Sequence, residues 1–68
     1  EELSELYQAL GMLSAREQTY LLYRFGFADD TAHPLLGTAL HFHLSESRAK
    51  RTEEQALDNL WLELPWWF

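Results

Sequence analysis

The sequence predicts an all-α fold, a four-helix domain with a helix-turn-helix in its C-terminal half. Apolar residues recur at the three- and four-residue spacing of amphipathic helices along most of the chain. Ser14 and Ser45 each precede such a stretch, where a serine hydroxyl can cap the first backbone N–H groups of a helix. Residues 35–60 are typical of two helices joined by a tight turn at 42–45, and the small Ala39 suits close contact between them.

Length and composition limit the fold and the location. The 68 residues make a single domain, 1–68, and a chain of this size buries only about 60% of the surface that its unfolded form exposes. The absence of cysteine excludes disulfides and thiolate metal ligands, which fits a cytoplasmic location. No apolar run approaches the roughly 18 residues of a membrane span, so no membrane partner is expected. Because the chain opens with Glu-Glu, we expect a fragment or a processed piece of a longer protein.

The net charge of −6 bears on nucleic-acid binding. Proteins that bind nucleic acid on their own are usually basic, because Lys and Arg contacts to phosphate supply most of the non-specific affinity. The charge therefore argues against a strong autonomous DNA binder. It still allows a module that a larger assembly holds onto DNA.

The first half of the chain predicts two helices. Ser14 and Glu17 form the capping-box pattern of the second helix, which should end at Gly26. Phe27 is expected to fold back onto the core. The first helix is expected over 2–13, with apolar residues at helical spacing: Leu3, Leu6, Tyr7, Leu10 and Leu13.

The second half predicts the helix-turn-helix. Residues 28–34 form a polar connection, and Pro34 suits the first position of a short helix over 35–42. The fourth helix should begin after Ser45 and continue to about Leu64, where the following proline ends it. Its predicted inward face is Ala49, Thr52, Ala56, Leu57, Leu60 and Leu64.

Several short segments, taken in order, resemble region four of bacterial RNA polymerase sigma factors. They are residues 13–17 (LSARE), 23–27 (YRFGF), the six-residue connection ADDTAH and the turn 42–45 (FHLS). The resemblance covers about residues 6–61. Further residues then fall where the family has its Arg, Glu and Ala-Leu-x-x-Leu pattern: Arg48, Glu53, Ala56, Leu57 and Leu60.

In that family, region four binds the flap of the polymerase beta subunit and reads the upstream promoter element. The resemblance implies that the partner is the RNA polymerase core or a regulator, and that promoter DNA is a ligand. Arg16 and Arg24 match positions that touch DNA phosphates, and Arg48 and Lys50 match cationic positions on the recognition helix. Arg51 adds a charge where the family usually has Gln. The candidate DNA-binding residues are Arg48, Lys50, Arg51, Ser47, Arg16 and Arg24.

Acidic residues on the fourth helix argue for weakened DNA binding. Glu46 stands where the family has Arg, and the outward half of the helix places Glu54 and Asp58 beside the cations. Residues 45–57 hold three basic and three acidic side chains, for a net charge of zero. The alternative is therefore a solvated helix face with intrahelical ion pairs, such as Lys50 with Glu54.

The second hypothesis for function is a protein-interaction module that kept the helix-turn-helix as a scaffold and lost DNA binding. Its contact surface would be the aromatic tail, 61–68. The tail could instead cover the open side of a small core. If exposed, it would dock a partner protein or a second copy of the chain. The candidate interaction residues are Trp61, Trp66, Trp67, Phe68 and Leu36.

Neither a metal site nor a catalytic centre is expected. The chain has three histidines, at positions 33, 41 and 43. His41 and His43 are two residues apart, so they share no helical face, and no further ligand lies at a spacing typical of a metal site. The serines lack the strained turn and the orienting acid of a nucleophilic site. The sequence therefore indicates a binding protein without a cofactor rather than an enzyme.

Overall fold

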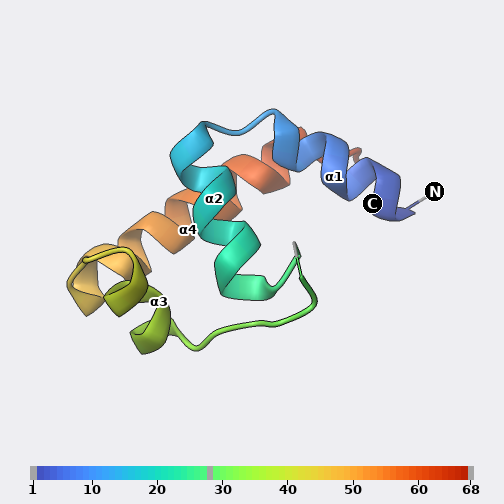
Figure 1. Cartoon of the computed structure of the whole chain (residues 1–68). Helices are drawn as coiled ribbons and strands as arrows, with labels where there is room; N and C mark the ends of the chain where they lie inside the picture. Colours follow the sequence, from blue (N-terminus) through green and yellow to red (C-terminus); the bar gives the residue numbers. More distant parts are fainter. Residues whose placement is uncertain (1, 28, 68) are drawn as a thin grey trace.

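The computed structural model describes residues 2–27 and 29–67, and over these residues the chain is all-helical, with four helices and no strand (Figure 1). The predicted all-α, four-helix fold is confirmed. None of these helices has the length and apolar character that crossing a bilayer requires. The helices are α1 (Glu2–Gly11), α2 (Ala15–Phe25), α3 (Leu35–His41) and α4 (Glu46–Glu63).

The long helix α4 is the central element of the fold, because each of the other three helices packs against it. Helix α3 lies beside the N-terminal end of α4, α2 crosses its middle, and α1 lies beside its C-terminal end (Figure 1). Helices α3 and α4 are joined by residues 42–45 and pack on one another, which gives the expected helix-turn-helix. Within the turn, His43 adopts a left-handed backbone with φ of 59°.

The predicted caps set the helix boundaries. The Ser14 and Ser45 hydroxyls accept hydrogen bonds from the backbone N–H groups of Glu17 (3.2 Å) and Arg48 (3.1 Å). Gly26 ends α2 with a φ of 74°, a left-handed conformation that glycine adopts without steric cost.

Three details differ from the sequence prediction by small margins. Helix α1 ends at Gly11 rather than 13, and Pro34 is the N-cap of α3 rather than its first helical residue. The Glu17 carboxylate accepts a hydrogen bond from Asn59 Nδ2 on α4 (2.8 Å). This tertiary bond replaces the bond to the N-cap backbone that the glutamate of a capping box would make.

The core consists of a few large side chains packed against alanines. Ala39, Ala49 and Ala56 are fully buried, and their small size allows α2, α3 and α4 to pack closely. Leu57, predicted to face inward, is 37% exposed because it lies at the edge of the stripe that Ala49, Ala56 and Leu60 define. The other buried apolar residues are Ala9, Leu10, Leu13, Tyr20, Leu21 and Leu60, with Phe27 packed against them as expected.

Candidate nucleic-acid interface

Three of the predicted DNA-binding residues surround one shallow, open hollow of about 260 Å³. Arg16 comes from the first turn of α2, and Arg48 and Arg51 come from the N-terminal half of α4. All three side chains are exposed to solvent. The lining residues are Arg16, Leu44, Arg48, Arg51, Thr52 and Gln55, which we call the arginine hollow.

The local structure explains why these arginines meet. The Ser45 cap fixes the start of α4, so Arg48 and Arg51, three residues apart, lie on the same side of the helix. The Ser14 cap fixes the start of α2 and places Arg16 in its first turn. Among the described residues no carboxylate forms an ion pair with any of these arginines. Their positive charge is therefore directed to solvent, as an anionic ligand requires.

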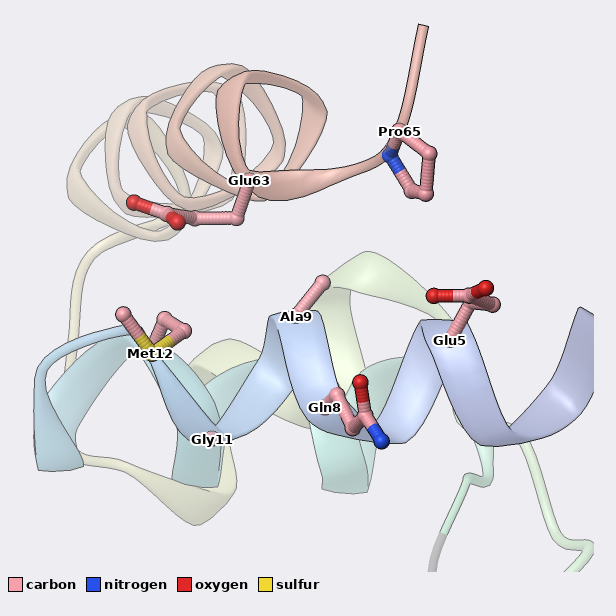
Figure 2. Close-up of a pocket in the computed structure, with 7 residues that line it drawn as sticks. All are labelled: Glu5, Gln8, Ala9, Gly11, Met12, Glu63 and Pro65. Carbon is pink, nitrogen blue, oxygen red and sulfur yellow. The ribbon is translucent and has the colours of Figure 1, made fainter. Parts of the chain in front are cut away.

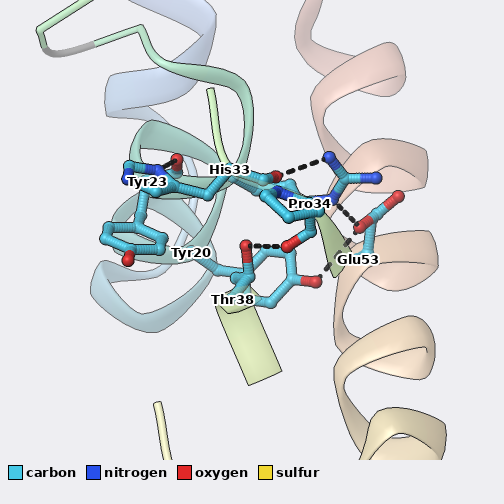
Figure 3. Close-up of polar contacts among 7 residues, drawn as sticks. Tyr20, Tyr23, His33, Pro34, Thr38 and Glu53 are labelled. Atoms are coloured by element: carbon cyan, nitrogen blue, oxygen red, sulfur yellow. Dashed lines mark hydrogen bonds and ion pairs between the residues drawn. The ribbon is translucent and has the colours of Figure 1, made fainter. Parts of the chain in front are cut away.

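Arg24 occupies a different environment from the other candidates. Its Nε donates to Glu53 Oε1 (2.8 Å) and its Nη1 donates to the carbonyl oxygen of His33 (2.8 Å), as Figure 3 shows for the contacts around Glu53 and His33. Its guanidinium also lies 4.8 Å from the centroid of the Phe25 ring. Arg24 therefore joins α2, α4 and the connection before α3, and it does not line the arginine hollow.

Glu53 is a structural residue that the sequence offered only as a family match. The same oxygen, Oε1, accepts hydrogen bonds from Arg24 and from the Tyr20 hydroxyl (3.1 Å). Burial, together with the hydrogen bond to the Glu53 carboxylate, raises the pKa of Tyr20 to about 12. The neutral Tyr20 hydroxyl is thus held as a donor beside the ion pair.

Lys50 and Ser47 are exposed on α4 but lie outside the arginine hollow. Within the described residues Arg24 and Glu53 form the only ion pair, so Lys50 and Glu54 do not form the one that their spacing predicts. Glu54 and Asp58 are also exposed on α4. The outward surface of α4 therefore carries cations and acids side by side, whereas the lining of the arginine hollow contains three arginines and no acid.

Two of the three histidines, His33 and His41, take part in a ring stack that the sequence did not reveal. Tyr23 lies between His33 and His41, with ring centroids 3.8 Å and 3.9 Å away and planes within 10° of parallel. His33 Nδ1 lies 2.9 Å from the Tyr23 carbonyl oxygen, which can only accept, so Nδ1 carries a proton. Over the part of the chain that the structure describes, no three His, Cys, Asp or Glu residues are grouped to hold a metal ion.

The aromatic tail lies on the surface. Trp61 is 72% exposed and Trp66 is 94% exposed, and Trp67 is exposed as well, so these tryptophans do not cover the core. Leu64 and Pro65 alone are half-buried here, and Phe68 lies outside the described residues. Leu36 is exposed on α3, at the other end of α4 from the tail, and so belongs to a separate surface (Figure 1).

No protein-family model matches this chain, and no curated protein matches it.

Proposed function

We propose that this chain is a sigma-factor region-four-like domain that binds RNA polymerase or a regulator and contacts promoter DNA through its helix-turn-helix, together with Arg16 of α2. The observation that carries the proposal is the arginine hollow. Arg16, far from the helix-turn-helix in sequence, joins Arg48 and Arg51 on one open surface. This arrangement supports phosphate binding, because guanidinium groups from two helices can contact the same DNA backbone.

The proposed roles differ among the candidates. Arg16, Arg48 and Arg51 contact phosphates and set the orientation of the domain on the duplex. In this proposal Lys50 and Ser47, which are exposed on α4, contact base edges when the helix enters the major groove. Arg24 acts as a scaffold residue, since its guanidinium is engaged by Glu53 and by the His33 carbonyl.

The proposed DNA contact is weak without a partner. Three phosphate-binding arginines act against a net charge of −6 and against the acids on α4. A partner that holds the domain near DNA would raise its effective concentration there, and this would compensate for the weak intrinsic affinity. RNA polymerase core or a bound regulator would act in this way, and such a role would place the chain in the cytoplasm.

Equilibrium titration tests the proposal. Fluorescence anisotropy of a labelled promoter duplex and a random duplex is measured against the chain at about 50 mM salt, where phosphate contacts are strong. The proposal expects binding to both duplexes, with loss of binding in the combined variant Arg16→Gln, Arg48→Gln and Arg51→Gln. The matched control, with Lys at the same three positions, keeps the charge and should retain most of the affinity. If the chain binds neither duplex, the proposal is contradicted.

The exposed tryptophans favour one second candidate, a protein-interaction module in which the aromatic tail docks a partner protein or a second copy. Exposed aromatic side chains of this size are enriched at binding hot spots. Sedimentation of the chain, compared with a version ending at Leu64, tests the homodimer form of this candidate. A dimer that the truncation converts to a monomer supports it, and a monomer in both cases removes it.

A further inference from the structure

A second surface lies at the opposite end of α4 from the arginine hollow, and it has the reverse charge. A groove of about 500 Å³ runs between α1 and the C-terminal end of α4. Figure 2 shows the side chains of Glu5 and Met12 on α1 and just after it, facing Glu63 and Pro65. The groove is lined by Glu5, Gln8, Ala9, Gly11, Met12, Glu63 and Pro65. We call it the acidic groove.

Part of the lining of the acidic groove is apolar, and one of its apolar side chains, Met12, is flexible. Ala9, Met12 and Pro65 supply its apolar side chains. Met12 is 69% exposed, although its flexible thioether side chain usually fills gaps in a core. An exposed methionine beside a proline offers contact area to an aliphatic side chain of a ligand.

Four sources of negative potential converge on the acidic groove. Glu5 and Glu63 place carboxylates on its two sides, one from each helix. Helix α1 ends at Gly11 and α4 ends at Glu63, so two helix C-termini, which carry partial negative charge, also meet there. Neither helix has a basic residue in its last turn, where one would offset this charge. The groove is thus complementary to a cation.

Among the residues that the structure describes, no Lys or Arg lines the acidic groove. All five Lys and Arg residues lie between positions 16 and 51, and segments 1–15 and 52–68 contain none. Over the described residues neither Glu5 nor Glu63 forms an ion pair. Within the described residues, then, no side chain supplies the positive charge that would complement the groove.

We propose that the acidic groove binds a short basic segment of a partner protein, in which Lys or Arg side chains flank an aliphatic anchor. The cations contact Glu5 and Glu63, and the anchor packs on Met12 and Pro65. The volume is within the range of about 300–1,000 Å³ that is usual for ligand clefts, which accommodates a few side chains. This surface is separate from the arginine hollow, so the inference goes beyond the proposed DNA contacts.

Calorimetric titration with a designed peptide tests this inference. The probe is a synthetic 14-residue amphipathic peptide of Lys and Leu, and the control peptide has Glu in place of every Lys. The Lys–Leu peptide should bind at low salt and weaken as salt rises, whereas the Glu–Leu peptide should not bind. In NMR spectra the shifts of Glu5, Met12 and Glu63 should change most on addition of the peptide.

Paired variants separate this site from general attraction to an acidic protein. The double variant Glu5→Gln with Glu63→Gln should weaken peptide binding roughly tenfold, since each partly exposed ion pair accounts for a few-fold change. The control, Glu46→Gln with Glu54→Gln, changes the net charge equally, from −6 to −4, at two exposed sites outside the groove. It should leave the affinity within twofold of the unmodified chain. Met12→Ser should weaken binding at high salt as well, because its contact is apolar.

Four outcomes overturn the inference. They are no binding of the Lys–Leu peptide at low salt, equal binding of the Glu–Leu peptide, equal weakening in the control variant, and self-association of the chain through Glu5 and Glu63. The last outcome would make a second copy the occupant. The variant without the three arginines of the arginine hollow should bind the peptide as the unmodified chain does. Failure of the proposed DNA contact can therefore be told apart from failure of the peptide site.

Discussion

The Arg24 guanidinium donates to the Glu53 carboxylate across the interface of α2 and α4, with Nε and Oε1 2.8 Å apart. Both side chains are mostly buried, at 22% and 18% exposed. Tyr20 and the His33 carbonyl complete the same network (Figure 3). Through Arg24 the connection before α3 is joined to α2 and α4, which positions the helix-turn-helix.

Arg24→Ala should destabilise the fold by about 1–3 kcal/mol, because it leaves the Glu53 carboxylate and the His33 carbonyl without their donor. Urea denaturation measures the change in the free energy of unfolding. Arg48→Ala is the control, and its exposed side chain should change that free energy by no more than about 0.5 kcal/mol. Equal stability of the two variants would contradict a scaffold role for Arg24.

The stability of the domain should fall as the pH rises from about 10 toward 12. In the unfolded chain the Tyr20 hydroxyl ionises near its ordinary pKa of about 10, whereas burial and the Glu53 hydrogen bond raise its pKa in the fold to about 12. The unfolded state therefore binds fewer protons in this window, and unfolding becomes more favourable by up to about 1.4 kcal/mol per pH unit. The contribution is fully present below pH 10.

The measurement is the free energy of unfolding at several pH values from 8 to about 12, for the unmodified chain and for Tyr20→Phe. Since the variant lacks the hydroxyl, the difference between the two curves isolates Tyr20 from the other titrating groups. Parallel curves above pH 10 would count against the raised pKa.

Gly26→Ala should destabilise the domain by more than about 1 kcal/mol. The φ of Gly26 is 74°, and a Cβ atom there would lie 2.7 Å from backbone atoms of Thr31 and Ala32. Gly11→Ala is the matched control, because a Cβ at that helical position meets nothing within 4 Å. It should leave stability unchanged or raise it slightly, given the higher helix propensity of alanine. Thermal unfolding of both variants distinguishes a backbone requirement at Gly26 from a general cost of removing glycine.

Tyr23→Leu should lower the free energy of unfolding by about 1–2 kcal/mol, because it removes two stacked ring contacts and keeps an apolar side chain. The spectroscopic signature is specific. The ring current of Tyr23 should shift the His33 and His41 ring protons upfield, and the shift should disappear in the variant while His43 remains unchanged. Ring-proton shifts of His33 and His41 that match His43 in the unmodified chain would show that the stack does not form.

The helices and their caps could be predicted because local chemistry determines them. Ser14, Ser45 and Gly26 act on backbone groups within a few residues, so their effect is visible in the sequence. Leu57 was assigned wrongly because helical spacing gives the direction of a face and not its width.

The candidate surfaces were predicted less completely, because they depend on tertiary contacts. Arg16 could be connected with Arg48 only through a family resemblance, since they lie on different helices. Arg24 is a DNA-binding candidate only through the family resemblance, and nothing in its neighbourhood in sequence indicates its contact with Glu53, 29 residues away. The burial or exposure of the tail stayed open for the same reason, and the structure places Trp61 and Trp66 in solvent.

The salt dependence of DNA binding tests the central claim, that the arginine hollow binds phosphates, most directly. If three arginines each neutralise one phosphate, the logarithm of the association constant should fall with the logarithm of salt concentration with a slope of about −3. Removing Arg48 alone, as Arg48→Gln, should reduce the magnitude of that slope by about 1. A slope near zero in the unmodified chain, or a slope that Arg48→Gln leaves unchanged, would contradict the account.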